Sequence, residues 1–563
     1  MKFKILILML AFATTVMAEK KVDYNKYNNF YYNVYDYDSD HTDTSTIVVE
    51  RVGNMCVVYN PNQVGKPVPG LARELTLADY VHDSLTFDLM YDTIVFRSSR
   101  QLSRSDIEWT KETLTKTRTR YTCYVNSNKL EFVVEASHHC INPLPQYGLQ
   151  EGVLVEYWRN GQLQIQLNKW DDKASSMMLK AFTPVNLTYV TAAEQDRIKR
   201  ERLVISTRIF DQVQLSWGQQ NDSASDLATT DKVLHFAGGT LAMRRVHLQA
   251  LPPHYQTFVE IHQRSNGDAY DRTGSLFVIP HRMYYSFLDG LNDPKNLSTI
   301  TDRLGQQYQG VVKSKGYEPL VELVRFFTPF GVGKFNEKVA IEGLEWNNET
   351  YYKQEVTDMA EMLQGDVWIG IWIGNYDKGG HIVSVDLKSY PGEEVWRDAG
   401  IVDGVMPLFN TCNVLEMAGQ NYGKMFLTDS LQTTFEIPQG VKSIRLRYIT
   451  TGHGGWGGGD EFNPKPNTIL VDGVKVAEYT PWREDCGCYR EWNPVSGNFW
   501  NGLSSSDYSR SGWCPGTATQ PVYFDLSGLE PGTHTITVAI PQGKPMEGSF
   551  SAWNVSGALI IGR

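Results

Sequence analysis

Short segments in which apolar and polar residues alternate recur along almost the whole chain, and they constrain the fold more than any other feature. Examples lie at residues 46–50, 129–135, 153–158, 535–540 and 558–561. Such alternation marks strands with one buried face, and turn-forming residues separate the segments. Helical periodicity is scarce. The pattern predicts a mostly β protein built from jelly-roll β-sandwiches.

The length and the changes of composition predict several domains. At 563 residues the chain is long enough for roughly three to four of them. A polar segment interrupts the strand pattern at 219–231, and a second boundary falls near the Tyr-Pro-Gly at 390–392. We predict a signal peptide at 1–18, a mainly β N-terminal accessory domain at 19–218, a linker at 219–231, and two adjacent jelly-roll domains at 232–390 and 391–563.

The first residues predict export. Lys2 and Lys4 precede an apolar run at 5–13, and Val16-Met17-Ala18 resembles a cleavage point, as in a secretory signal peptide. No other stretch is long and apolar enough to cross a bilayer. We therefore expect a periplasmic or extracellular protein without a membrane span.

Net charge excludes one class of partner. The chain carries a formal charge of -11, whereas binding to nucleic-acid phosphates needs an excess of Lys and Arg. The one dense basic run, 197–202, contains Glu201 and is expected on the solvated face of a helix that begins near Thr191. We expect no nucleic-acid partner, and a monomer.

Seven cysteines predict disulfide chemistry in an exported protein. Cys123 and Cys140 flank a hairpin and could form a bridge. One bridge is also expected among the three cysteines at 486, 488 and 514. Cys56 and Cys412 lie in apolar segments and are expected in the core.

A glycine-rich loop at 451–468 joins two predicted strands and carries His453, Trp456, Asp460 and Glu461. Glycine lets a backbone approach a ligand closely, and acids beside an aromatic ring suit a sugar. A mobile loop with solvated charges is the other interpretation. No Lys-Ser/Thr follows the glycines, so the loop is not a phosphate cradle.

Sequence motifs for metal, nucleotide or serine chemistry are absent. The chain has no HExxH, Gly-x-Ser-x-Gly or Rossmann pattern, and the aspartates between 36 and 43 lack the glycine and the glutamate of a calcium loop. No metal or cofactor is expected. Carboxylates at strand ends remain as candidates for acid and base chemistry, namely Asp268, Asp271, Asp460 and Glu461.

Residues 510–516, Arg-Ser-Gly-Trp-Cys-Pro-Gly, resemble the RAGWCPG signature of the peptide:N-glycosidase F family. Further segments agree in order over about residues 230–563: Asp268–Arg272 resembles DEWDR, Arg325–Pro329 resembles RFITPY, and Glu461-Phe462 resembles AEW. The longer members of this family have an extra N-terminal domain, which 19–218 resembles.

The resemblance implies an amidase that cleaves the bond between asparagine and the first N-acetylglucosamine of an N-linked glycan, with two jelly rolls and no metal. Asp271 and Glu461 take the places of the catalytic acids. The implied substrate-binding residues are Arg272, Trp372, His453, Arg510 and Trp513. Cys488 and Cys514 match the family's remaining disulfide.

Departures from the family pattern leave alternatives open. Gly370 stands where the family has a third acid, so either the reaction tolerates the loss, another carboxylate such as Asp377 substitutes, or the chain is slow or restricted. A non-catalytic glycan-binding protein and an endo-glycosidase cutting within chitobiose are the alternative functions.

Overall fold

The computed structural model describes residues 22–562 with gaps. The gaps lie at 38–41, 62–72, 92–93, 174–185, 220–221, 223–230, 237–238, 252–254, 337–341, 344, 392–401, 413–423, 455–458, 495–503 and 545–550. The predicted signal peptide, most of the predicted linker and the centre of the glycine-rich loop with Trp456 lie outside the described residues. The contacts divide the chain into two units, Met1–Leu203 and Val204–Arg563.

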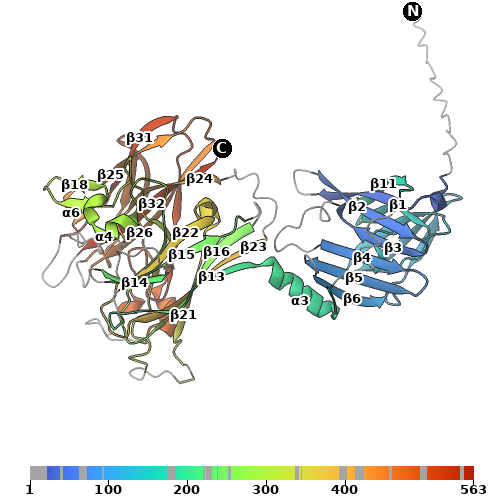
Figure 1. Ribbon diagram of the computed structural model, residues 1–563, viewed down its shortest axis with the longest axis horizontal. Helices are drawn as coiled ribbons and strands as arrows, with labels where there is room; N and C mark the ends of the chain where they lie inside the picture. Colours follow the sequence, from blue (N-terminus) through green and yellow to red (C-terminus); the bar gives the residue numbers. More distant parts are fainter. Residues whose placement is uncertain are drawn as a thin grey trace, which may run out of the picture. The chain divides into compact units, whose positions relative to one another are not determined.

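The first unit is built on one 12-stranded sheet in the part of the chain that is described. The strands are ordered β12-β6-β5-β4-β3-β2-β1-β11-β10-β9-β8-β7, antiparallel except where β12 joins β6 (Figure 1). Their bounds, with those of the helices, are η1 (Tyr24–Lys26), β1 (Asn29–Tyr37), β2 (Thr42–Val52), β3 (Met55–Tyr59), β4 (Arg73–Asp79), β5 (Ser84–Tyr91), β6 (Ile94–Gln101), β7 (Thr110–Thr113), β8 (Arg118–Val125), β9 (Asn128–Glu135), η2 (Pro145–Tyr147), β10 (Val153–Arg159), β11 (Gln162–Asp171), β12 (Asn186–Tyr189) and α3 (Ala192–Leu203). The predicted mainly β N-terminal domain is confirmed.

Helix α3 ends the first unit and corrects the predicted domain boundary. The Thr191 hydroxyl accepts a hydrogen bond from the backbone N–H of Glu194 at 3.1 Å, as an N-cap does. The basic run on this helix is largely exposed and Arg197 pairs with Glu201, as predicted. The next strand, β13 (Ile205–Leu215), pairs with β23 (His381–Pro391), so it belongs to the second unit and the boundary lies before it rather than at 218.

The second unit begins with a sandwich of two sheets. A four-stranded sheet, β13-β23-β16-β21, faces a six-stranded sheet, β14-β15-β22-β17-β20-β29, across a buried apolar core (Figure 1). Apart from β13 and β23, the elements of this half are β14 (Asp231–Phe236), β15 (Gly239–Leu248), β16 (Tyr255–Ser265), β17 (Thr273–Ile279), α4 (Phe287–Asn292), η3 (Pro294–Asn296), β18 (Thr299–Thr301), β19 (Gln307–Gln309), β20 (Val321–Phe327), β21 (Glu349–Glu355), η4 (Thr357–Met362), β22 (Gly365–Ile373) and, from later in the chain, β29 (Ala518–Thr519).

The second sandwich pairs two four-stranded sheets, β24-β32-β26-β30 and β25-β31-β27-β28. Its elements are β24 (Val402–Asn410), α6 (Met425–Thr428), β25 (Leu431–Ile437), β26 (Ser443–His453), β27 (Asn467–Val471), β28 (Val474–Tyr479), η6 (Cys486–Trp492), η7 (Ser505–Asp507), β30 (Val522–Asp525), β31 (Gly532–Ala539) and β32 (Ala552–Gly562). The two adjacent jelly-roll sandwiches are therefore present as predicted. The turn at Asp472-Gly473 joins β27 to β28, and both residues adopt the positive φ that this tight hairpin requires.

A buried polar cluster, called here the Arg325 junction, connects the two sandwiches. Arg325 on β20 forms an ion pair with Glu322 at 2.6 Å, and both side chains are 0% exposed. The same guanidinium donates to the carbonyl of Asn554 at 2.7 Å and to the hydroxyl of Thr451 at 3.1 Å, which belong to the second sandwich. Ser556 on β32 donates to Glu322 from the same side. Since every bond is buried, the junction fixes the register between the sandwiches.

The predicted Cys123–Cys140 bridge is not formed. Both thiols are free, Cys123 on β8 and Cys140 beyond β9. Cys140 packs instead beside Cys56, whose thiol donates to the Cys140 carbonyl at 3.6 Å, and burial raises the Cys140 pKa to about 12. Cys56 and Cys412 are buried, as predicted.

Among the described residues, no helix has the length and apolar character to span a membrane.

Candidate active site

Asp271 lies in a tight turn that leads into β17. The carboxylate of Asp268 organises this turn, because it accepts hydrogen bonds from the Tyr270 N–H at 3.0 Å and from Arg272 Nε at 2.8 Å. The Thr328 hydroxyl donates to the Tyr270 carbonyl at 2.8 Å and accepts from the Arg272 N–H at 2.7 Å. The neighbours of Asp271 are thus fixed on both sides, and its own carboxylate, 21% exposed, reaches Arg510.

Glu461 follows β26 in the second sandwich, and its backbone is anchored from two directions. The preceding Asp460 is fully buried and accepts hydrogen bonds from Trp553 Nε1 at 2.7 Å and from the Gly543 N–H at 2.9 Å. Ser511 donates its N–H to the Glu461 carbonyl at 2.9 Å and its hydroxyl to the Asp460 carbonyl at 2.7 Å. Of the two adjacent acids, Asp460 therefore holds the loop, and Glu461 presents a carboxylate that is 16% exposed.

Arg510 joins the two candidate acids. Its guanidinium forms an ion pair with Glu461 and lies 3.4 Å from Asp271, so one buried cation faces a carboxylate from each sandwich. The same group donates to the Ser505 carbonyl at 2.8 Å and lies 4.3 Å from the centre of the Trp513 ring. Since its side chain is 1% exposed, Arg510 has little freedom to move.

The pKa values of both acids are raised. Burial raises the pKa of Glu461 to about 7; Arg510 opposes the rise and the charge of Asp271 adds to it. Burial likewise raises the pKa of Asp271 above its ordinary value, against the attraction of Arg510. With the pKa of Glu461 near 7, the pair can hold a proton near neutral pH. A pair of acids poised in this way suits proton transfer.

His453 supports the site through its packing and stays neutral. It lies at the end of β26, 7% exposed, with its ring near those of Phe327 and Trp513 and its Nε2 2.8 Å from the Thr451 hydroxyl. Burial and the nearby charges of Arg325 and Arg510 lower its pKa to about 3.

The two tryptophans that were predicted to bind substrate are almost wholly buried. Trp513 is 3% exposed, stacks on Phe327 at 4.1 Å and donates from Nε1 to the Gly452 carbonyl at 2.9 Å. Trp372 on β22 is also 3% exposed and packs directly on Gly239, where a Cβ would come within 2.0 Å of the indole nitrogen. Trp513 therefore reaches the site through Arg510, which rests on its ring.

Gly370 occupies a position that has no room for an acid. A Cβ there would lie 2.5 Å from the ring of Phe277 on the adjacent strand. Asp377, which was considered as a substitute, closes a turn instead. Its carboxylate accepts hydrogen bonds from the N–H groups of Gly379 at 2.7 Å and Gly380 at 3.0 Å. No acid at 370 or 377 thus adds to the Asp271–Glu461 pair.

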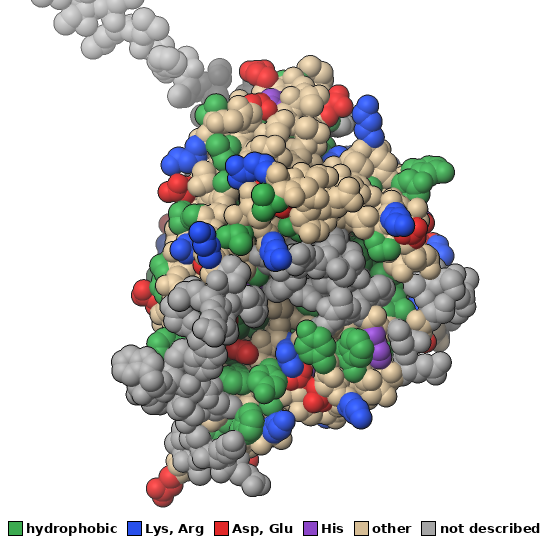
Figure 2. Space-filling view, turned by 90° about the vertical axis from the view of Figure 1, so that its left-hand side faces the viewer, with side chains coloured by type: hydrophobic (Ala, Val, Ile, Leu, Met, Phe, Trp, Pro, Cys, Tyr) green, Lys and Arg blue, Asp and Glu red, His purple; other side chains and the backbone are tan. Residues whose placement is uncertain are grey.

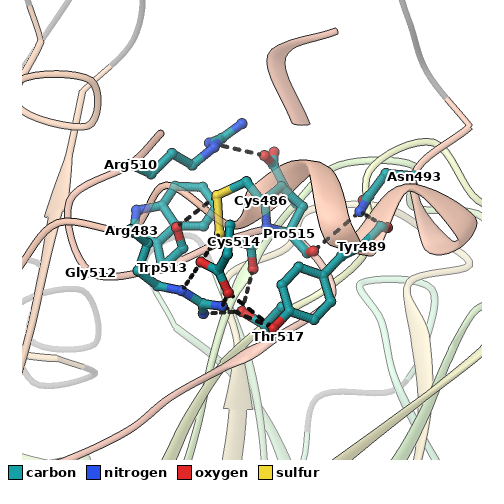
Figure 3. The surroundings of a disulfide bond; sticks show 12 residues. Arg483, Cys486, Tyr489, Asn493, Arg510, Gly512, Trp513, Cys514, Pro515 and Thr517 are labelled. Carbon is teal, nitrogen blue, oxygen red and sulfur yellow. Dashed lines mark hydrogen bonds and ion pairs between the residues drawn. A yellow bond between two sulfur atoms is a disulfide. The ribbon is translucent and has the colours of Figure 1, made fainter. Parts of the chain in front are cut away.

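The disulfide beside the Trp-Cys-Pro-Gly element joins Cys486 to Cys514, which corrects the predicted Cys488–Cys514 pair (Figure 3). Cys486 begins the 3₁₀-helix η6 and is buried, whereas Cys488 is exposed and free. A 3₁₀-helix has three residues per turn, so side chains two positions apart point in different directions. The bridge fastens the segment that carries Arg510.

Three exposed aromatic side chains of the first sandwich were not predicted from the sequence: Tyr270, Trp217 and Tyr376. Tyr270 could have been found from its place beside the candidate acid. Trp217 and Tyr376 are far from it in sequence and carry no motif. In the part of the chain that is described, no group of three or more His, Cys, Asp or Glu side chains is arranged to hold a metal ion.

Comparison with known proteins shows the family of the chain. The family models described as "Peptide-N-glycosidase F, N terminal" and "Peptide-N-glycosidase F, C terminal" match residues 206–389 and 421–560. A solved structure of PNGF-II is 35% identical, covers 95% of this chain and 99% of that chain, and superimposes with a TM-score of 0.71. The chain belongs to the peptide-N-glycosidase F family.

Within the peptide-N-glycosidase F family, a second crystal form of PNGF-II gives 35% identity and a TM-score of 0.67 over 95% of this chain and 98% of that chain. PNGase F, a glycosylasparaginase from Flavobacterium meningosepticum, is 19% identical, covers 64% of this chain and 96% of that chain, and gives a TM-score of 0.42. No curated protein sequence matches the chain.

Proposed function

We propose that the protein is an exported amidohydrolase that cleaves the amide between an asparagine side chain and the first N-acetylglucosamine of an N-linked glycan. The observation that carries this proposal is the convergence of Asp271 and Glu461, one from each sandwich, on the single buried cation of Arg510. Family membership and the name glycosylasparaginase given to PNGase F support the same reaction. The Cys486–Cys514 disulfide fits an oxidising, exported location.

The reaction needs an activated water and a protonated leaving nitrogen, because an amide resists attack by neutral water. Glu461, with a pKa near 7, is suited to orient the water and to take its proton. The hydroxide adds to the side-chain carbonyl carbon of asparagine, the carbon–nitrogen bond breaks, and the nitrogen leaves with a proton supplied through Asp271. The products are an aspartate in the peptide and a glycosylamine.

Arg510 contributes by position and by charge. Its contacts with both carboxylates fix the distance between the two groups that exchange protons. A buried cation also stabilises negative charge that develops on the amide oxygen during attack. Arg272, held by Asp268, is placed on the same turn to bind the sugar or the peptide.

A glycan-binding protein without catalysis is the second candidate. The observation that favours it is Gly370, because the ring of Phe277 fills the space that the family's third acid would need.

One glycopeptide experiment separates the two. The wild-type protein and an Asp271→Asn variant are incubated with a defined N-glycopeptide, and the peptide product is weighed by mass spectrometry. We expect the wild type to leave aspartate in place of asparagine and the variant to release no glycan while still binding the substrate. Binding without release by either protein would support the second candidate, and a peptide that retains one sugar would indicate an endo-glycosidase.

A further inference from the structure

A row of ring and guanidinium groups runs from the catalytic turn across the surface of the first sandwich. The aromatic row consists of Tyr270, Arg272, Tyr376, Trp217 and His235. It begins at the residue before Asp271. Four separate segments of the chain supply its members, so the row exists only in the folded protein.

The members of the aromatic row contact one another in order. The Arg272 guanidinium lies 5.0 Å from the centre of the Tyr270 ring and 5.7 Å from that of Tyr376. The Tyr376 ring lies 6.3 Å from Trp217, and Trp217 stacks on His235 at 4.8 Å with an interplanar angle of 19°. The row is therefore continuous.

Three of the four rings of the aromatic row are exposed to solvent, and His235 is half-buried. Tyr270 is 53% exposed, Tyr376 62% and Trp217 40%. Exposed rings contribute little to folding, so a contiguous group of them calls for another explanation, most often a binding site. Figure 2 shows hydrophobic side chains gathered beside basic and acidic side chains and a histidine on the face that it draws.

Hydrogen bonds hold the row in place before any ligand binds. The backbone N–H of Trp217 donates to the backbone carbonyl of Asp377 at 3.0 Å, and the His235 ring nitrogen Nε2 lies 2.9 Å from the Ser216 carbonyl oxygen. Arg272 is fixed by the almost fully buried Asp268, whose pKa is lowered to about 2 although its burial opposes the shift, because His381 and Arg272 stabilise its charge. A preorganised surface loses little conformational entropy on binding.

We infer that the aromatic row binds the sugar units of the N-glycan that lie beyond the chitobiose unit. This inference rests on the proposed function, which places the innermost sugar and its amide at Asp271. Pyranose rings present an apolar face to aromatic side chains and hydroxyl groups to charged neighbours, and the row offers both. A peptide that binds as an added strand would need backbone hydrogen bonds along a sheet edge, whereas the row offers ring faces.

The test compares two substrates that share one peptide. One carries only the chitobiose unit and the other a complete high-mannose glycan, and kcat/KM is measured for each. The variants are Trp217→Ala and Tyr376→Ala, with Trp217→Phe and Tyr376→Phe as controls that keep a ring. Tyr284→Ala is a control for loss of an exposed tyrosine outside the row, since Tyr284 is 83% exposed.

We expect each alanine variant to lower the ratio of kcat/KM for the long glycan to that for chitobiose about tenfold, as loss of one or two stacking contacts predicts. The phenylalanine variants and Tyr284→Ala should keep the wild-type ratio. A ratio that stays constant in the alanine variants overturns the inference. So does a loss that follows the length of the peptide rather than that of the glycan.

A binding measurement separates this inference from the proposed function. Affinity for the high-mannose glycopeptide is measured by calorimetry in Asp271→Asn and in Asp271→Asn combined with Trp217→Ala. A tenfold weaker affinity in the double variant supports the row even if the wild type releases no glycan. Equal affinities overturn it even if catalysis proceeds as proposed.

Discussion

Arg325 and Arg510 are both buried almost completely, with side chains 0% and 1% exposed, and both bind carboxylates. At the Arg325 junction one cation faces one carboxylate, Glu322, which also accepts hydrogen bonds from two serine hydroxyls. At the candidate active site one cation faces two carboxylates, Glu461 and Asp271. The first site is balanced in charge, and the second carries an excess negative charge whenever both acids are ionised.

The difference distinguishes an arginine–carboxylate pair that stabilises the fold from one that can take part in proton transfer. The balanced, hydrogen-bonded pair of Arg325 and Glu322 holds the two sandwiches in register. At the candidate active site, burial raises the pKa of Glu461 to about 7 and the charge of Asp271 adds to the rise, so a proton is available near neutral pH. The contrast can be tested at both cations, at the neighbouring disulfide and at Glu461.

Replacing Arg510, the cation of the candidate active site, should lower activity more than stability. In Arg510→Gln we expect glycan release to fall about a thousandfold, because the developing negative charge and both acids lose their cation. The fold should persist, because Asp271 and Glu461 have raised pKa values and can take up protons. Release is measured on a glycopeptide with Arg445→Gln, an exposed arginine on β26, as the control. Near wild-type release by Arg510→Gln would contradict the mechanism.

Replacing Arg325, the cation of the Arg325 junction, should instead lower stability more than activity. In Arg325→Gln we expect the free energy of unfolding to fall by about 3–5 kcal/mol, since Glu322 is left buried with an uncompensated charge. Urea denaturation followed by tryptophan fluorescence measures the change. A second substitution, Glu322→Gln, should restore part of the loss. An equal loss of stability in Arg510→Gln would remove the distinction between the two sites.

The disulfide sharpens the comparison, because it holds only the segment of Arg510. Cys486→Ser should lower the free energy of unfolding by roughly 3 kcal/mol, as expected for a bridge closing a loop of this size. Cys488→Ser, two residues away, should have no effect, since that thiol is exposed and free. Thermal unfolding with and without reductant checks both. Stability lost in Cys488→Ser would favour the pairing that the sequence predicted.

The smallest of the expected effects is a dependence of stability on pH, which arises from Glu461. Because the pKa of folded Glu461 is about 7 against an ordinary 4.5, the folded protein keeps a proton that the unfolded chain releases between these values. The free energy of unfolding should therefore fall as pH rises from 4.5 to 7, by on the order of 2 kcal/mol after solvent screening.

The control for this pH effect is Glu461→Gln, in which the fall attributable to residue 461 should be absent. Urea denaturation of both proteins across this range measures the difference. Parallel curves for the two proteins would show that the Glu461 pKa is not raised.

The sequence by itself determined the fold class, the candidate acids and the family. Alternating segments predicted the sandwiches, because the side-chain period of a strand is a local property. The family motifs are also local, because each consists of consecutive residues. The order of residues is therefore enough to show the resemblance of 510–516 and of Asp268–Arg272 to the peptide-N-glycosidase F family. The end of the first unit was misplaced, because the pairing of β13 with β23 joins strands that are distant in the chain.

Only the tertiary structure decided which charged residues face one another and which residues form one surface. The pairing of Cys486 rather than Cys488 depends on the direction of side chains in one turn of 3₁₀-helix. The packing of Phe277 against Gly370 and the continuity of Tyr270 with Trp217 depend on contacts between distant segments. The physical reason is the same in each case. Burial, charge balance and packing are properties of neighbours in space, and a sequence lists only neighbours along the chain.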